Sequence, residues 1–447
     1  MNDPLTPDIA ERKGQLEYQL VDLKPTYSEG EAIAEANRCL YCHDAPCVNA
    51  CPTGIDIPGF IRKIATGNVR GSARRILSAN LLGYSCARVC PVEVLCVGAC
   101  VYNDWHRTPP IQIGRLQRYA VEKTLSNGHA TALLPRARAT GKKVACIGAG
   151  PASLAAAGYL ALEGVAVTVL EKRELAGGLN TTGVAPYKMH VDASLAEVGY
   201  IRSLGVKIEN GVEVGKNRKI DDLLREFDAV FVGVGLGADA RLGIPGEDGP
   251  GVFGATAWIE RLKLERGFSA DLKASSLVIG GGNTAIDVAR ELARLGVREV
   301  SLVYRRGATD MPGYGHEMKA ARQEGVQLIE HAVPSEFVRD KAGKLVALKL
   351  ADGRELPARL VVVGIGQAKL RDLLGHLPGV ATDEKGRVVV DEATGRTGNP
   401  KIFAGGDALG GELVVTAVQE GKRAARGICA ALGVSARPDS PMNAGHV

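Results

Sequence analysis

The chain has 447 residues, 45% of them hydrophobic, which is enough for several buried cores and predicts roughly two to four domains. Its 55 Lys and Arg against 50 Asp and Glu leave a net charge of +5, too weak an excess for the concentrated basic stripe that nucleic-acid binding requires. The first residues are polar and no run of about 18 apolar residues follows, so we expect no signal peptide and no membrane contact, and we expect a cytoplasmic protein.

Residues 1–138 combine cysteines, arginines and short helical patterns, which predicts a small helical domain. A polar stretch at 126–141, interrupted by Pro135, predicts a linker after it. Eight of the ten cysteines form two groups in this region. Because no secretory signal is expected, metal binding or redox chemistry is favoured over structural disulfides. The groups are Cys39-x2-Cys42-x4-Cys47-x3-Cys51-Pro52 and Cys86-x3-Cys90-x5-Cys96-x3-Cys100.

These spacings favour two [4Fe–4S] clusters, because short loops let three cysteines reach one cluster while a fourth, held before a proline, reaches another. Structural zinc is an alternative, although zinc commonly uses paired two-residue knuckles and the second group contains no Cys-x2-Cys. A thiol–disulfide device is a further alternative. The other two cysteines, Cys146 and Cys429, lie in a predicted strand and a predicted helix and are expected to be small buried hydrophobic residues.

From about residue 139 onward, short β-branched runs alternate with amphipathic helical patterns, which indicates parallel sheets covered by helices. A strand that ends in a glycine turn and opens a helix occurs at 143–162 and again at 276–295. We therefore predict an α/β fold with two Rossmann-like dinucleotide-binding domains, one inserted in the other. The expected ranges are 139–254 and 367–447 for the FAD domain and 255–366 for the NAD(P)H domain.

The first glycine turn follows a strand and precedes a helix, a second strand and an acidic residue. Gly148 permits the tight turn, Gly150 lets the backbone approach a pyrophosphate at the helix start, and Ser153 is small enough for close helix packing. Glu171 is placed to accept hydrogen bonds from a ribose diol. Because this pattern does not distinguish FAD from a nicotinamide nucleotide, both remain open here. Pro151, Ala152 and Lys172 complete the expected dinucleotide site.

Two other stretches resemble the FAD-contacting segments of flavoprotein reductases that bind two dinucleotides. One is Gly177-Gly178-Leu179, and the other is "KIFAGGDALGG", which contains Gly406 and Asp407. The resemblance implies that Gly178, Leu179, Gly406 and Asp407 contact FAD. Two ordinary glycine turns are the alternative.

The second glycine turn comprises Gly280, Gly281, Gly282, Asn283 and Thr284. Where the first motif has an acidic residue, this one has Arg305 and Arg306, whose guanidinium groups would pair with a ribose 2′-phosphate. The pair favours NADP(H) over NAD(H). A solvated basic strand end is the alternative, and a site that uses both nucleotides is also compatible with the sequence.

The whole chain resembles the family that contains the glutamate synthase small subunit, the N-terminal half of dihydropyrimidine dehydrogenase and the bacterial dihydropyrimidine dehydrogenase small subunit. The resemblance lies in "CHDAPCVNACPTGIDIPGFIRKIATGN", "CARVCPVEVLCVGAC", "IQIGRLQRYA", "GGGNTAIDVAR" and "VYRRG". It implies one cluster on Cys39, Cys42, Cys47 and Cys100, and another on Cys51, Cys90, Cys96 and Gln117.

This assignment leaves Cys86 without a cluster, whereas a purely local interpretation makes Cys86 a ligand and Gln117 an ordinary helix residue. The resemblance also puts Lys188 near the flavin ring, with a solvated loop lysine as the alternative.

The two glycine turns and the cysteine groups together predict an NAD(P)H-dependent oxidoreductase. In it, FAD takes an electron pair from NAD(P)H and passes the electrons one at a time to the iron–sulfur clusters. We find no sequence for a pyrimidine-binding barrel and no N-terminal cysteine nucleophile, since residue 2 is Asn2. We therefore expect an electron-input subunit that works with a separate catalytic subunit in a hetero-oligomer, closest to the dihydropyrimidine dehydrogenase small subunit. The name of that small subunit's family implies NADH as the electron donor, whereas Arg305 and Arg306 favour NADPH. The sequence leaves this conflict open. The alternatives are an input module for glutamate synthase or another reductase, and a zinc-stabilised nucleotide-binding interaction protein. No protein residue is assigned a catalytic role.

Overall fold

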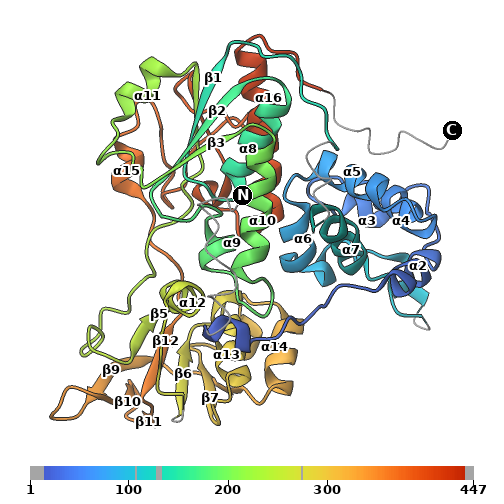
Figure 1. Cartoon of the computed structure of the whole chain (residues 1–447). Coiled ribbons are helices and arrows are strands. Elements are labelled where there is room, and N and C mark those ends of the chain that lie inside the picture. The colour runs from blue at the N-terminus through green and yellow to red at the C-terminus, as the bar shows by residue number, and fades with distance from the viewer. Residues whose placement is uncertain (1–14, 106–107, 127–132, 273–274, 438–447) are drawn as a thin grey trace. The chain divides into compact units, whose positions relative to one another are not determined.

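We describe the chain from a computed structural model, which covers residues 15–105, 108–126, 133–272 and 275–437. The chain divides into two compact units (Figure 1). Unit 1 contains 15–23, 182–191 and 237–368, and unit 2 contains the remaining described residues. No helix in the described part of the chain is both long enough and apolar enough to cross a bilayer.

Unit 2 begins with a helical region around the cysteines. Its helices are α2 (Glu29–Asn37), α3 (Pro46–Asn49), α4 (Ile57–Ala65), α5 (Val69–Ala79), α6 (Gly83–Val89) and α7 (Ile113–Ser126), with short 3-10 turns at η2 (Val92–Val94) and η3 (Val101–Trp105). Local sequence explains several helix starts. Ser28 and Glu31 form a capping box on α2, Asp56 caps α4, and Asn68 caps α5. The apolar faces of α4, α5 and α7 pack together over Phe60, Ile61, Ile76 and Leu116.

The rest of unit 2 is built on a parallel sheet with the strand order β13-β4-β1-β2-β3. The strands are β1 (Lys143–Ile147), β2 (Ala166–Glu171), β3 (Lys207–Asn210), β4 (Ala229–Val232) and β13 (Ile402–Ala404). Helices α8 (Pro151–Leu162), α10 (Val191–Ser203) and α16 (Val414–Ala431) lie on one side of the sheet, and α11 (Ile220–Glu226) and α15 (Arg371–Gly375) lie on the other (Figure 1). All residues of β4 are buried, as expected for a parallel strand covered on both faces.

Unit 1 contains a second parallel sheet with the order β5-β12-β6-β7-β8. The strands are β5 (Val252–Gly254), β6 (Ser276–Ile279), β7 (Val300–Val303), β8 (Gln327–Ile329) and β12 (Leu360–Val363). Its helices are α12 (Ala255–Leu264), α13 (Asn283–Arg294) and α14 (Gly315–Gln323). An antiparallel sheet of β9 (Pro334–Arg339), β10 (Leu345–Leu350) and β11 (Glu355–Pro357) completes the unit.

Alternating residues of β6 supply two different cores, because successive side chains of a strand face opposite sides of the sheet. Val278 packs with Trp258 of α12 and Ile286 of α13. Leu277 and Ile279 pack instead with side chains of β9 and β10. The helices therefore cover one face of this sheet and the antiparallel sheet covers the other.

The predicted fold class is confirmed. The cysteine-rich region is helical, two Rossmann-like parallel sheets follow, and the second sheet is inserted, because β13 returns to the first sheet after the second is complete. Cys146 in β1 and Cys429 in α16 are buried, as expected. Unit 1 also takes in 237–254, which the sequence assigned to the FAD domain, while the domain ranges themselves stay predictions. Part of the expected linker, 127–132, lies outside the described residues.

Candidate redox site

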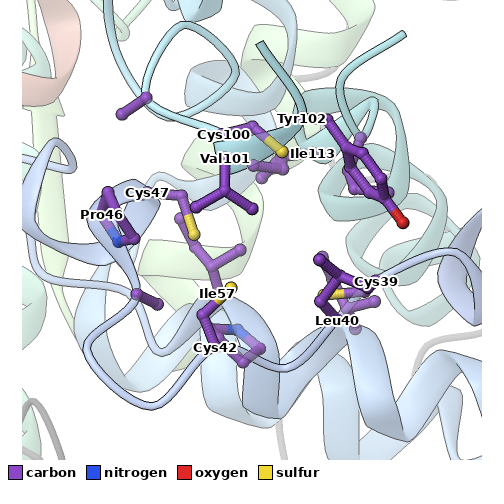
Figure 2. A pocket seen from close by; sticks show the side chains of 15 residues that line it. Cys39, Leu40, Cys42, Pro46, Cys47, Ile57, Cys100, Val101, Tyr102 and Ile113 are labelled. Atoms are coloured by element: carbon purple, nitrogen blue, oxygen red, sulfur yellow. The ribbon is translucent and has the colours of Figure 1, made fainter. Parts of the chain in front are cut away.

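Four cysteines line one cavity, partly open to solvent, in the helical region of unit 2. Cys39 and Cys42 lie in the loop after α2, Cys47 lies in α3, and Cys100 directly precedes η3. Figure 2 shows their sulfur atoms turned toward one shared space. The other walls are largely apolar: Leu40, Ile57, Ile61, Val101 and Ile113. Among the described residues, no three His, Cys, Asp or Glu side chains group tightly enough to hold a single metal ion. The four sulfurs surround a space instead.

Burial, together with the neighbouring Cys39, Cys100 and Cys42, raises the pKa of the Cys47 thiol to about 12. Burial likewise raises the pKa of Cys39. Without a bound cation these groups would be protonated thiols at neutral pH. A reactive redox thiol needs a lowered pKa. All ten cysteines are free. These environments argue against a thiol–disulfide device and suit ligands that a metal deprotonates on binding.

A second group of thiols lies around Cys90, the residue that ends α6. The pKa of Cys90 is raised by a hydrogen bond with Cys86, by burial, and by the nearby Cys96 and Cys51. Burial raises the pKa of Cys96 to about 12, with Cys51 and Cys47 adding to the effect. The structure thus brings Cys51, Cys90 and Cys96 together.

Both sequence-based candidates for a fourth ligand lie in this neighbourhood. Cys86 is buried in α6, one turn before Cys90. Gln117 is buried in α7 and donates its Nε2 to the carbonyl oxygen of Gly83 at 2.6 Å. Because that bond uses the amide nitrogen, the amide oxygen is the atom of Gln117 that would serve as a ligand. The geometry leaves the choice between these two residues open.

The first glycine turn forms as its sequence predicts locally. Gly148 has a φ of +84°, and a Cβ there would lie 2.8 Å from the carbonyl oxygen of Gly233. Helix α8 starts after Gly150 without a side-chain cap, so its first N–H groups are available to a phosphate. Glu171, at the end of β2, accepts hydrogen bonds from the backbone of Ala149 at 2.7 Å and Arg173 at 2.9 Å. Its carboxylate is therefore held at the edge of the turn.

The two other expected FAD segments meet this turn. A Cβ on Gly178 would lie 2.6 Å from the Cα of Gly150, and Gly177 donates its N–H to the carbonyl of Ala149. Gly406, at the start of the 3-10 helix η6 (Gly406–Leu409), lies against Ala152, to whose side chain a Cβ would come within 3.0 Å. Three segments far apart in sequence thus meet in one cradle, and at Gly178 the backbone of Gly150 lies too close for any side chain.

The remaining residues of this expected site have varied surroundings. Burial raises the pKa of Asp407 to about 6, with Glu412 adding to the shift and Lys369 opposing it. The side-chain oxygen of Ser153 lies close to Gly233, where a Cβ would come within 2.2 Å. The other expected positions are helical or exposed: Pro151 opens α8, Leu179 opens α9 (Leu179–Thr182), and Lys172 is exposed after β2.

The second glycine turn opens α13 in unit 1. Gly280 has a φ of +144°, and a Cβ on Gly281 would lie 2.5 Å from the ring of Tyr304. Around Gly282 the space is open, and α13 has no side-chain cap. Asn283 accepts a hydrogen bond from the backbone of Tyr314 at 2.9 Å, and Thr284 is exposed beside it. The turn therefore offers an open helix start to an anion.

The two arginines after β7 differ from each other. Arg306 donates to the hydroxyl of Tyr304 at 2.7 Å and to the carbonyl of Asp310 at 3.3 Å. Arg305 is exposed. Since Tyr304 also contacts Gly281, the arginine pair and the second glycine turn belong to one neighbourhood.

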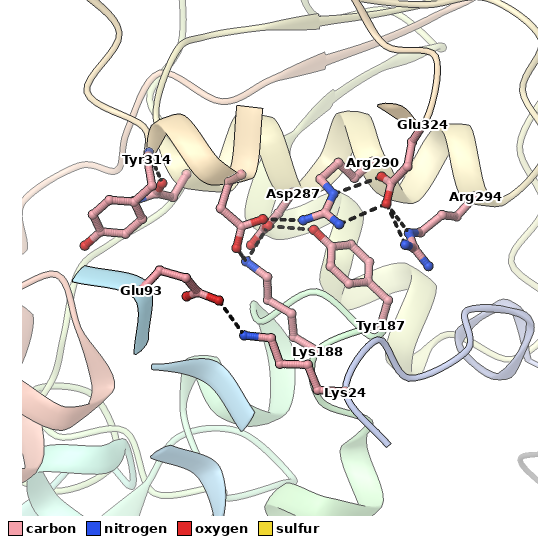
Figure 3. Close-up of polar contacts among 11 residues, drawn as sticks. Lys24, Glu93, Tyr187, Lys188, Asp287, Arg290, Arg294, Tyr314 and Glu324 are labelled. Atoms are coloured by element: carbon pink, nitrogen blue, oxygen red, sulfur yellow. Dashed lines mark hydrogen bonds and ion pairs between the residues drawn. The ribbon is translucent and has the colours of Figure 1, made fainter. Parts of the chain in front are cut away.

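Lys188 is not a solvated loop lysine, and that alternative is wrong. Its Nζ lies 2.7 Å from Asp287 and 2.8 Å from Glu317, and only 19% of the side chain is exposed (Figure 3). Burial alone would lower its pKa, but the two carboxylates outweigh burial and the pKa is raised. The network continues through Tyr187, Arg290, Arg294 and Glu324. Lys188 thus belongs to unit 1, paired with carboxylates of α13 and α14, and its contact with flavin stays a prediction.

Two buried ionisable side chains join the two parts of unit 2, and neither was predicted from the sequence. Glu197 of α10 accepts hydrogen bonds from the backbone N–H groups of Tyr84 at 2.9 Å and Ser85 at 3.2 Å. Lys422 of α16 donates to the carbonyls of Thr53 and Ala79, both at 3.1 Å. The sequence does contain a pattern that indicates a buried Lys422, because this residue lies on the apolar stripe of its helix, four residues after Val418.

Comparison with known proteins agrees with this arrangement. Residues 17–129 match the family described as dihydropyrimidine dehydrogenase domain II, 4Fe-4S cluster, and residues 142–421 match the pyridine nucleotide-disulphide oxidoreductases. The fold is similar to that of T. acidophilum thioredoxin reductase, with a TM-score of 0.54 and 25% identity over 66% of this chain and 100% of that one. Fold and site define an NAD(P)H-dependent oxidoreductase subunit that combines iron–sulfur, FAD and nicotinamide sites.

Several relatives align along most of the chain. The glutamate synthase [NADPH] small chain of Escherichia coli (strain K12) is 34% identical over 92% of this chain and 93% of its own length. The NAD-dependent dihydropyrimidine dehydrogenase subunit PreT of the same strain is 35% identical over 92% of this chain and 96% of its own length. The beta subunit of the NADP(+)-dependent formate dehydrogenase of Moorella thermoacetica is 35% identical over 85% of this chain and 59% of its own. The chain belongs to this family of pyridine nucleotide-disulphide oxidoreductases with an N-terminal 4Fe-4S domain, which confirms the resemblance in the sequence.

Proposed function

We propose that this chain is the electron-input subunit of a heteromeric reductase, which takes reducing equivalents from NAD(P)H and passes them through FAD and two [4Fe–4S] clusters to a separate catalytic subunit. The main support is the grouping of the cysteines in the folded chain, which differs from their grouping in the sequence. Cys100 lines the cavity of Cys39, Cys42 and Cys47, although it belongs to the second group in sequence. Cys51 lies instead with the group of Cys90 and Cys96. Cys47 also lies close enough to Cys96 to raise its pKa, so the two sets of thiols adjoin each other, which suits two neighbouring clusters.

The residues present fit the proposed groups. One cluster would use the four cysteines of the cavity, and the other would use Cys51, Cys90 and Cys96 with Gln117. At the cradle of Gly150, Gly178 and Gly406, a Cβ on Gly178 would clash with the backbone of Gly150, and a Cβ on Gly406 would press on Ala152. A Cβ on Gly150 would meet no protein atom closer than 3.9 Å, so this side of the turn is open to a pyrophosphate. When bound, FAD accepts two electrons together from a nicotinamide and releases them singly, as one-electron clusters require. The domain ranges that go with this proposal are 1–138, 139–254 with 367–447, and 255–366.

For the catalytic partner we propose a dihydropyrimidine dehydrogenase that reduces uracil or thymine. The similarity to PreT over 96% of its length supports this assignment. Glutamate synthase is the second candidate, because its small chain in E. coli is almost equally similar. For the nicotinamide, we propose that Arg305 and Arg306 favour the phosphorylated form, NADPH, through the charge they carry beside the second glycine turn.

Anaerobic purification from the native source tests the function. We expect a yellow-brown protein that contains FAD, iron and acid-labile sulfide, that is bleached by NAD(P)H, and that co-purifies with a second subunit. The complex should oxidise NAD(P)H with uracil or thymine. Oxidation that depends instead on glutamine and 2-oxoglutarate would identify glutamate synthase. A colourless protein with stoichiometric zinc would overturn the proposal in favour of a zinc-stabilised nucleotide-binding protein.

A pair of substitutions tests the fourth ligand. We expect Gln117→Ala to alter the EPR signal of one reduced cluster and Cys86→Ala to leave both signals intact. Both side chains are buried, Cys86 within α6 and Gln117 of α7 against the carbonyl of Gly83 in α6, so each variant controls for the packing loss of the other. The opposite pattern would assign the ligand role to Cys86.

A further inference from the structure

We propose that Lys422 is a positioning residue for the cluster of Cys51, Cys90 and Cys96: its buried ammonium group fixes the backbone beside Cys51 and raises the reduction potential of that cluster. The inference rests on the proposed function, because it needs a cluster at these cysteines. It assigns a role to a residue outside both cysteine groups and both glycine turns.

The ammonium group of Lys422 is held by backbone next to the cysteines. Only 3% of Lys422 is exposed, and its Nζ donates to the carbonyls of Thr53 and Ala79. Thr53 follows Cys51 by two residues, and its hydroxyl lies 3.4 Å from the sulfur of Cys51. Asn80 donates its side-chain amide to the same hydroxyl at 3.4 Å. The lysine therefore holds the segment that aims Cys51.

The same turn of α16 also contacts the FAD cradle. Glu420 accepts a hydrogen bond from the backbone N–H of Gly406 at 2.6 Å. At Gly421 a Cβ would lie 2.2 Å from the carbonyl oxygen of Ala152 in α8, so the two helices touch backbone to backbone. Three consecutive residues, 420 to 422, thus contact an FAD segment, the helix of the first glycine turn, and the cysteine loop. One rigid helix sets the separation between the cradle and the cysteines.

The positive charge of Lys422 would also raise the reduction potential of the cluster. Reduction adds one electron, and so one negative charge, to a cluster whose thiolate ligands are already negative. In a buried region of low dielectric, a nearby fixed cation stabilises that added charge more than water-exposed charges do. Net charge and hydrogen bonding around a cluster are among the factors that set its potential. Lys422 supplies the charge, and the Thr53 that it holds brings a hydroxyl to within 3.4 Å of the Cys51 sulfur.

The test is a potentiometric titration of the full-length chain, purified anaerobically with its clusters and followed by EPR with dithionite as the one-electron reductant. For Lys422→Met, which keeps the apolar stem and removes the charge, we expect the equilibrium constant for reduction of one cluster to fall tenfold or more, which is about 59 mV for one electron. The other cluster should keep its potential. Lys422→Arg should restore most of the loss. Lys385→Met, which removes a charge from an exposed position, should change neither potential.

The outcomes separate the possibilities. Unchanged potentials in a fully loaded Lys422→Met protein would overturn the inference while leaving the proposed function intact. If Lys422→Met and Lys422→Gln lose one cluster but Lys422→Arg keeps it, the charge is required at this site and the inference stands. If the Lys422→Arg protein also lacks that cluster, the shape of the lysine side chain and not its charge is required, and the inference fails. Absence of any iron–sulfur signal in the unsubstituted chain would overturn the proposed function and this inference with it.

Discussion

Glu197 is a carboxyl group taken wholly out of water, and burial raises its pKa to about 7 although Ser85 and Tyr84 donate hydrogen bonds that favour the carboxylate. An unfolded chain would ionise it near its ordinary value of 4.5. The folded state therefore binds the proton more tightly, so the stability that this group contributes is complete below about pH 4.5 and is lost as the pH rises through about 7.

Glu197→Gln removes this titration while keeping the shape of the side chain. From the pKa difference, the unsubstituted chain should lose on the order of 3 kcal/mol relative to the variant between pH 5 and pH 8. Thermal unfolding of both proteins at several pH values in that window measures the difference. A gap between their transition temperatures that stays constant with pH would contradict the raised pKa.

A second prediction at the residue scale concerns the arginine pair, Arg305 and Arg306, which we propose favours NADPH. Arg305 is exposed, so its replacement costs little packing, whereas Arg306 also holds Tyr304 through its hydroxyl. We expect Arg305→Gln to raise the KM for NADPH by tenfold or more and to leave the KM for NADH nearly unchanged, because only NADPH carries the 2′-phosphate. Steady-state reduction of an artificial acceptor with each nucleotide is the measurement. Equal effects on both would show that the arginine does not read the phosphate.

At the scale of elements, the FAD cradle depends on loops that approach each other more closely than a side chain permits. Gly178 has a φ of +57°, and its Cβ position is blocked by the backbone of Gly150. Gly211 in the same unit has a φ of +74° but no atom within 4 Å of its Cβ position, so it is a matched control. Both positions carry the left-handed backbone cost of about 1–2 kcal/mol.

Gly178→Ala should therefore purify with little or no FAD, while Gly211→Ala keeps FAD and loses only stability. The flavin absorbance per polypeptide and the transition temperature separate the two effects. Full FAD content in Gly178→Ala would show that the 177–179 loop is not part of the flavin site.

At the scale of the molecule, the cysteine region has little reason to be stable without its clusters. Of its eight clustered thiols Cys86 is buried and the others are partly buried, and the pKa values of Cys39, Cys47, Cys90 and Cys96 are raised, so sulfur-bearing groups occupy space that apolar side chains would otherwise fill. Metal binding at such sites contributes directly to folding.

We expect removal of iron by an anaerobic chelator to lower the unfolding temperature of the cysteine region while the sheets with FAD and nucleotide sites stay folded. Limited proteolysis of the iron-free protein should cut first within 24–126. Cleavage in the parallel sheets before the cysteine region would contradict this order.

Much of this protein follows from local sequence. The two glycine turns, the alternation of strands and helices, and the grouping of the cysteines depend on neighbours within about 30 residues, so spacing alone predicted two nucleotide-binding sheets and an iron–sulfur region. The interleaving of Cys100 with the first group came only through the family resemblance, because nothing in local spacing joins residues so far apart.

Tertiary structure alone decided which side chains meet across the sequence. It paired Lys188 with Asp287 and Glu317, and it turned Glu197 and Lys422 inward against backbone beside the cysteines. It also set Gly233 and Gly421 against helix α8, where a side chain would not fit. Burial, which determines whether a charge is solvated or must find a partner, is a property of the assembled fold. Sequence determined the kinds of sites in this protein, and packing determined the charges that surround them.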